Sequence, residues 1–191
     1  MKNIKIKPEL VNKIKDVLKE SPIKEEVIHA ELVLNWLLQL KSDADEALQI
    51  AALSHDIDRG VTKITESHLK DYSEGYVEYK KQHALRSAKF IAEILKEYKY
   101  PTEVIEKVTR LVEKHEVGGD EESDILRDAD SLAYFEYNIP FYLHRNGEER
   151  TKRKIQFMYN RMSDKAKKIA NAIKYQDEKI MELVRNTISN L

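Results

Sequence analysis

The stretch ADEALQIAALSHDIDRG, residues 44–60, does most to decide the fold. It predicts a helix from Ala44 to about His55, capped by Ser42 and Asp43, with apolar residues on several sides. Such a helix is expected inside a core and not on a surface. His55 and Asp56 stand side by side at its end, where an ionised aspartate is costly unless it is paired with a charge or a metal. The stretch therefore predicts a helical core with a polar centre.

Periodic apolar patterns extend in both directions from this stretch. They predict helices over 8–19, 22–40, 44–55, 77–99, 101–117, 123–137, 148–162 and 163–189. Ser21 and Pro22 are expected to open the second helix, and Pro140 to break the helix that reaches Tyr137. Residues 59–76 lack a period and predict a long connection, which could act as a lid bearing Tyr72 or Tyr76. No stretch alternates like a strand, so the predicted fold class is all-α.

Composition agrees with one folded, helical domain. Hydrophobic residues make up 41 % and charged residues 35 % of the 191, which excludes a disordered chain. Only five glycines and four prolines occur, which favours long helices over a turn-rich sheet protein. We expect a single domain over 1–191, with its core over about 22–137 and a C-terminal helical extension over about 148–191.

The charge balance and residue usage exclude several classes of function. The net charge of -1 argues against general nucleic-acid binding. The absence of cysteine excludes disulfides, thiolate ligands and a cysteine nucleophile. No signal peptide and no apolar run of membrane-spanning length is found, so we expect a cytoplasmic protein without a membrane partner. Assembly into a homo-oligomer stays open.

Four further ionisable side chains fall on segments that should be buried. His29, His83 and His115 lie on apolar helices, and Asp130 shares a helical face with Leu126 and Ala133. A lone core histidine is usually structural. Several imidazoles and two carboxylates in one core suit a divalent cation, because both groups are common metal ligands.

The order of these residues resembles the HD-domain superfamily. The resemblance rests on His29, on LSHDIDRG at 53–60, on HALRSAKFIAEIL at 83–95, on LVEKHE at 111–116 and on LRDADSL at 126–132. It covers about residues 22–137. It implies an HD-type helical bundle, here with additional C-terminal helices, and a metal-dependent enzyme.

The resemblance also implies a ligand set. The implied ligands of one metal are His29, His55, Asp56 and Asp130. Some relatives hold a second metal through two more histidines, here His83 and His115, with Asp56 as the bridge. The alternative is that these two contact substrate or pack. The cofactor is therefore one or two divalent ions, and Mn, Fe, Co, Ni, Mg and Zn are not distinguishable.

The implied activity is hydrolysis of a phosphate ester in a small phosphorylated molecule, such as a nucleotide. Asp56 would serve catalysis by bridging cations that activate a water. Arg59 would act beside it on the substrate phosphate, with Arg86 and Arg145 as further substrate-binding candidates. Each arginine has a plainer reading, as a solvated residue or a carboxylate partner. A diiron HD-domain oxygenase and a non-catalytic HD regulatory module are the alternative functions.

Overall fold

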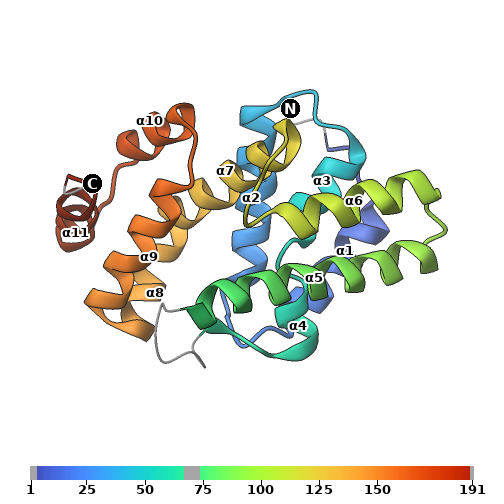
Figure 1. The fold of residues 1–191 in the computed structure, drawn as a ribbon, viewed down its shortest axis with the longest axis horizontal. Coiled ribbons are helices and arrows are strands. Elements are labelled where there is room, and N and C mark those ends of the chain that lie inside the picture. Colours follow the sequence, from blue (N-terminus) through green and yellow to red (C-terminus); the bar gives the residue numbers. More distant parts are fainter. Residues whose placement is uncertain (1–3, 67–73, 190–191) are drawn as a thin grey trace.

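The structure, a computed structural model, describes residues 4–66 and 74–189. Within these two ranges the chain is helical and contains no strand, which confirms the predicted fold class (Figure 1). In the same residues no helix is both long and apolar enough to cross a membrane. The elements are α1 (Pro8–Lys19), α2 (Glu26–Leu40), α3 (Glu46–Ser54), α4 (Asp58–Thr62), α5 (Glu74–Glu97), α6 (Thr102–Lys114), α7 (Glu121–Ala133), η2 (Tyr134–Asn138), α8 (Ile139–Asn146), α9 (Glu148–Asn160), α10 (Asp164–Ala172) and α11 (Glu178–Ile188).

Helices α1 to α7 surround the larger apolar cluster. Within it α2 packs against α7 and α3, and α5 packs along α6. Every residue of α3 from Ala47 to Ser54 is buried, as the all-round apolar pattern predicts. The polar residues that follow α3 are therefore delivered to the middle of the bundle.

A second apolar cluster is formed by η2 and α8 to α11, which occupy the left half of the molecule (Figure 1). Trp36 and Leu40 of α2 pack against both clusters. The C-terminal helices therefore adjoin the face of the bundle on which α2 and α7 lie, instead of forming a separate appendage.

Two predicted helix starts are wrong by a few residues. Ser21 and Pro22 do not open α2, because the Ser21 hydroxyl accepts a hydrogen bond from the Ile23 amide at 3.1 Å and the chain turns once more before Glu26. Helix α3 is capped by Asp45, whose carboxylate accepts from the Leu48 amide at 2.9 Å, and not by Ser42 or Asp43.

The predicted connection over 59–76 is shorter than expected. Arg59 lies in α4, and Tyr76 is a buried residue of α5; Tyr72 lies outside the described residues. Helix α4 was not predicted because Gly60 is unusual within a helix. The glycine is needed here, since a Cβ at this position would lie 2.1 Å from the Val17 carbonyl oxygen. Only glycine lets α4 rest directly on the backbone of α1.

Two further boundaries differ towards the C-terminus. Pro140 does not break the chain of helices, because it stands in the first turn of α8, where its missing N–H costs no hydrogen bond. The π-helical turn η2 joins α7 to α8 instead. The predicted helix over 163–189 divides into α10 and α11, with Ile173 in an extended conformation and Asp177 capping α11.

Candidate metal centre

Six buried side chains from five helices meet at the centre of the bundle. His29 comes from α2, His55 and Asp56 follow α3, His83 comes from α5, His115 follows α6, and Asp130 comes from α7. They form two groups whose ligand atoms lie within 4.8 Å of one another: His29, His55 and Asp130, and Asp56, His83 and His115. The structure thus brings together all six residues named from the sequence.

Asp56 lies between the two groups. Its Oδ1 is 2.6 Å from Nε2 of His83 and 3.9 Å from Nε2 of His115. Its Oδ2 is 3.4 Å from Nε2 of His55 and 3.9 Å from Nε2 of His29. Oδ1 of Asp56 thus faces His83 and His115, and Oδ2 faces His55 and His29.

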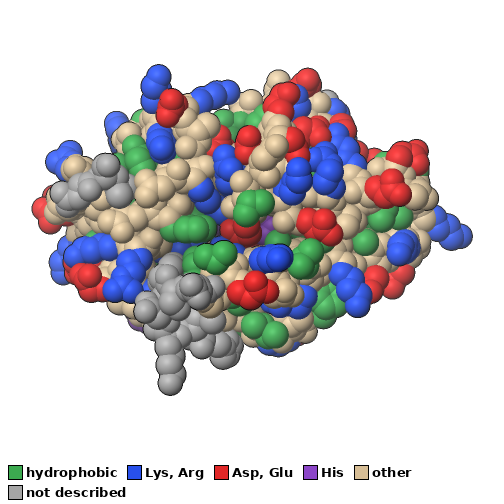
Figure 2. All heavy atoms as spheres, viewed as in Figure 1, with side chains coloured by type: hydrophobic (Ala, Val, Ile, Leu, Met, Phe, Trp, Pro, Cys, Tyr) green, Lys and Arg blue, Asp and Glu red, His purple; other side chains and the backbone are tan. Residues whose placement is uncertain are grey.

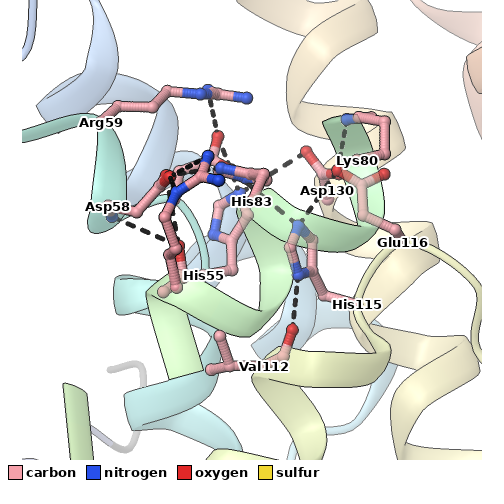
Figure 3. Close-up of polar contacts among 12 residues, drawn as sticks. His55, Asp58, Arg59, Lys80, His83, Val112, His115, Glu116 and Asp130 are labelled. Atoms are coloured by element: carbon pink, nitrogen blue, oxygen red, sulfur yellow. Dashed lines mark hydrogen bonds and ion pairs between the residues drawn. The ribbon is translucent and has the colours of Figure 1, made fainter. Parts of the chain in front are cut away.

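All four histidines present Nε2 to the centre and use Nδ1 for an outer partner. The partners are Asn138 Oδ1 for His29 at 2.9 Å and the Ala52 carbonyl for His55 at 3.0 Å. Nδ1 of His83 forms an ion pair with Asp58 Oδ1 at 2.5 Å, and Nδ1 of His115 lies 2.7 Å from the Val112 carbonyl oxygen (Figure 3). An outer acceptor of this kind fixes the ring and its tautomer, and it is typical of metal-binding histidines.

The donor atoms at the centre fit a cation. Nε2 of His55 and Nε2 of His115 are buried and find no hydrogen-bond partner in the described part of the chain. A buried polar atom without a partner is costly, whereas a metal ion would satisfy both nitrogens. Neutral imidazole and carboxylate suit Zn, Mn, Fe, Co and Ni, so the donor set admits a divalent metal without selecting one.

The local electrostatics keep the carboxylates ionised. Burial opposes ionisation, but the Arg59 guanidinium together with His55 and His83 outweighs burial and holds the pKa of Asp56 well below its usual range. Arg161 does the same for the pKa of Asp130. Burial also opposes a charge on His55, yet the two carboxylates raise its pKa to about 9. A cation would therefore displace a proton at His55 on binding.

A cavity of about 440 Å³ opens onto this centre. His29, Asp56 and Asp130 lie in its wall, together with residues of α4, α5, α8 and α9. Figure 2 shows acidic and histidine side chains at the bottom of a hollow near the middle of one face. Its volume is within the range of ordinary small-molecule sites, about 300–1,000 Å³.

The three predicted substrate arginines take different places. Arg59 lines the cavity and contacts Asp56 and, at 2.9 Å, Glu26 (Figure 3). Arg145 also lines it and forms an ion pair with Glu25. Arg86 is not among the residues that line the cavity; its Nε donates to Asp58 at 2.9 Å. Its plainer reading, as the partner of a carboxylate, is the one that the geometry favours.

Several residues of the site were missed in the sequence. Arg161 contacts Asp130, Ser131 Oγ at 2.8 Å and Glu116 Oε2 at 2.7 Å. Glu116 forms an ion pair with the buried Lys80 (Figure 3). A signal did exist in α9, whose buried face comprises Thr151, Lys154, Ile155 and Met158. A lysine inside an apolar stripe indicates a buried charge with a partner.

The fold has a counterpart among solved structures. It is similar to the crystal structure of a predicted HD superfamily hydrolase from an uncultured Thermotogales bacterium, with a TM-score of 0.61 and 19 % identity over 97 % of this chain and 94 % of that chain. At this identity the likeness concerns the fold, which is that of an HD-type helical protein. No curated protein matches the sequence.

A family model matches residues 9–184, nearly the whole chain. The match extends beyond α7 through α9 to α11, so it includes the helix that carries Lys154 and reaches into the cavity wall. The family is described as a domain of unknown function, and the chain belongs to it: DUF4202.

Proposed function

We propose that the protein is a metal-dependent phosphohydrolase of the HD superfamily, which cleaves a phosphate ester of a small molecule such as a nucleotide. The observation that carries the proposal is the pair of neighbouring ligand groups at the base of a cavity, with Asp56 in contact with histidines of both groups. The six residues that would hold the metal are His29, His55, Asp56, His83, His115 and Asp130. Bound divalent cations supply Lewis acidity for activating water and for neutralising phosphoryl charge.

The charges around the cavity favour an anionic substrate once cations are bound. The buried carboxylates near the centre include Glu26, Asp56, Asp58, Glu66, Glu116 and Asp130, and the buried cationic side chains include Arg59, Lys80, Lys154 and Arg161. Divalent cations held by the histidines would add positive charge to this set, which would favour the binding of a phosphate.

Different residues would have different roles in hydrolysis. Asp56 and Asp130 hold the centre, and the outer partners of the histidines keep each Nε2 aimed at it. Arg59 lies at the boundary between ligands and cavity, where its guanidinium can turn from Asp56 to a phosphoryl oxygen. Residues of α8 and α9 form part of the cavity wall, where they would surround a bound substrate. No covalent nucleophile is needed.

The test is phosphate release under anaerobic conditions. Protein loaded with Mn²⁺ or Co²⁺ is incubated with nucleoside monophosphates, sugar phosphates and a chromogenic phosphate ester. We expect phosphate release by the wild type and by Asp43→Asn, whose side chain is 82 % exposed, and none by Asp56→Asn. Strict dependence on iron and dioxygen, without phosphate release, would support the oxygenase. Metal binding without any turnover would support a regulatory module.

A further inference from the structure

A second set of charges lies in the cavity, apart from the metal-ligand residues. Lys154 of α9 and Glu66, which precedes α5, line the cavity and are 5 % and 8 % exposed. The Lys154 ammonium donates to Glu66 Oε2 at 3.1 Å and to the Tyr76 hydroxyl at 2.9 Å. The Tyr76 hydroxyl in turn donates to the same Glu66 oxygen at 3.2 Å. One anionic oxygen is thus held by two donors inside the cavity.

Lys80 of α5 also lines the cavity and lies near the same aromatic rings. Its ammonium is 5.9 Å from the ring centre of Tyr76 and 5.9 Å from that of Phe157. The Lys154 ammonium is 5.6 Å and 5.9 Å from the centres of these two rings. Aromatic faces stabilise a buried cation, so both lysines can keep their charge away from water.

The two lysines act on Glu66 together. Burial would raise its pKa, but Lys154, Lys80 and Arg59 together outweigh burial and lower the pKa of Glu66 to about 2. The position is therefore strongly favourable to a negative charge. Lys80 has its own partner in Glu116, so it can neutralise only part of a further anion.

We propose that Lys154 and Lys80 form a second anion-binding subsite, so that the substrate carries two anionic groups: the phosphate ester at the metal centre and a phosphoryl or carboxylate group at the lysines. The inference rests on the proposed function, whose substrate class it narrows. Glu66 occupies this subsite through its carboxylate, and the second anionic group of the substrate takes its place. A monoester without a second charge leaves Glu66 where it is.

The experiment measures binding and not turnover. Calorimetric titration of the Mn²⁺-loaded protein uses three probes that cannot be hydrolysed: methylphosphonate, methylenediphosphonate and phosphonoacetate. The measured quantity is the affinity of each doubly anionic probe divided by the affinity of methylphosphonate. The second and third probes distinguish a phosphoryl from a carboxylate as the second group, and a preference for either one supports the subsite.

Lys154→Met should reduce this ratio by about ten- to a hundredfold, as for the loss of a charged hydrogen bond. Lys152→Met is the matched control, because Lys152 stands on the same helix with a 37 % exposed side chain paired to Glu148 and Glu149. It should keep the wild-type ratio. Glu66→Gln should raise the ratio, since it removes the competing carboxylate and leaves the lysines in place.

The double variant Lys154→Met with Glu66→Gln controls for folding, because it leaves no buried charge without its partner. Its thermal unfolding should be cooperative, and its affinity ratio should be as low as that of Lys154→Met. A wild-type ratio in the double variant, or no rise in Glu66→Gln, would overturn the subsite. Since the probes report binding alone, this result stands apart from the hydrolysis assay, whose failure would overturn the proposed function instead.

Discussion

At the scale of single residues, Asp56 connects the two halves of the centre. Each of its oxygens faces a different group of histidines, and Arg59 holds it ionised. His83 and His115 belong to one group only. Loss of either should therefore damage one metal position and spare the other.

His83→Ala should reduce bound Mn²⁺ from two equivalents to one, because His29, His55 and Asp130 remain intact. Elemental analysis of protein purified without chelator measures the metal content. Asp56→Asn should lower both occupancies, since the amide carries no charge and only one of its two terminal atoms can accept a metal bond. If wild-type protein never binds more than one equivalent of Mn²⁺, the two-metal proposal is wrong. His83 would then be expected to contact the substrate instead of a metal.

Arg59→Ala should lower kcat/KM for a phosphate ester by about ten- to a hundredfold, from the loss of a charged hydrogen bond of about 1.5–3 kcal/mol. Metal content should stay near the wild-type value, because all six ligand side chains remain. Arg185→Ala is the control, since Arg185 stands at an exposed position of α11. Steady-state kinetics of both variants measure kcat/KM. Equal losses of kcat/KM in the two variants would mean that Arg59 does not contact the substrate.

At the scale of helices, α9 completes the site. It places Lys154 in the cavity wall, and Arg161, directly after its last residue, reaches Asp130 and Glu116. The Arg161 guanidinium forms an ion pair with Oδ2 of Asp130, while Oδ1 of Asp130 lies 3.1 Å from Nε2 of His29. Arg161 is thus a positioning residue, which keeps one oxygen of Asp130 directed at the centre.

Arg161→Met should weaken metal binding by about ten- to a hundredfold, as is usual when a partner of a ligand is lost. Competition with a fluorescent chelator measures the dissociation constant. Arg185→Met, at an exposed position of α11, should leave it unchanged. Restoration of tight binding by Arg161→Lys would show that charge is enough. A wild-type constant in Arg161→Met would mean that Asp130 needs no external support.

At the scale of the whole molecule, ligands converge from helices that are far apart in sequence, so bound metal should stabilise the complete fold. At a free metal concentration of about a hundred times Kd, the gain is about 2.7 kcal/mol. Thermal unfolding with Mn²⁺ and with chelator should show a higher Tm with metal for wild type and Asp43→Asn. Asp56→Asn should show little change. Equal shifts in all three proteins would point to binding elsewhere.

Periodicity predicted the all-helical class and the burial of the six ionisable side chains, because both are local signals, and the resemblance to the HD-domain superfamily implied that these side chains form one ligand set. Contacts that depend on the packing of distant segments were not predicted from the sequence. Gly60 appeared to belong to a loop, since only the approach of the Val17 backbone shows why α4 needs a glycine. Arg161 and Lys154 were not assigned to the site, since Asp130 and Glu66, which they contact, lie 31 and 88 residues away in the sequence. Pro140 was misjudged because a π-helical turn leaves no apolar period.

The most direct test of the account is a titration of metal-free protein with Mn²⁺, in which phosphate release from a phosphate ester is followed against bound metal. The account predicts no release without metal and a maximum rate close to two equivalents per chain, with the second equivalent and the maximum absent in His83→Ala. Phosphate release that does not depend on metal, or full metal binding without release from any phosphate ester, would contradict it.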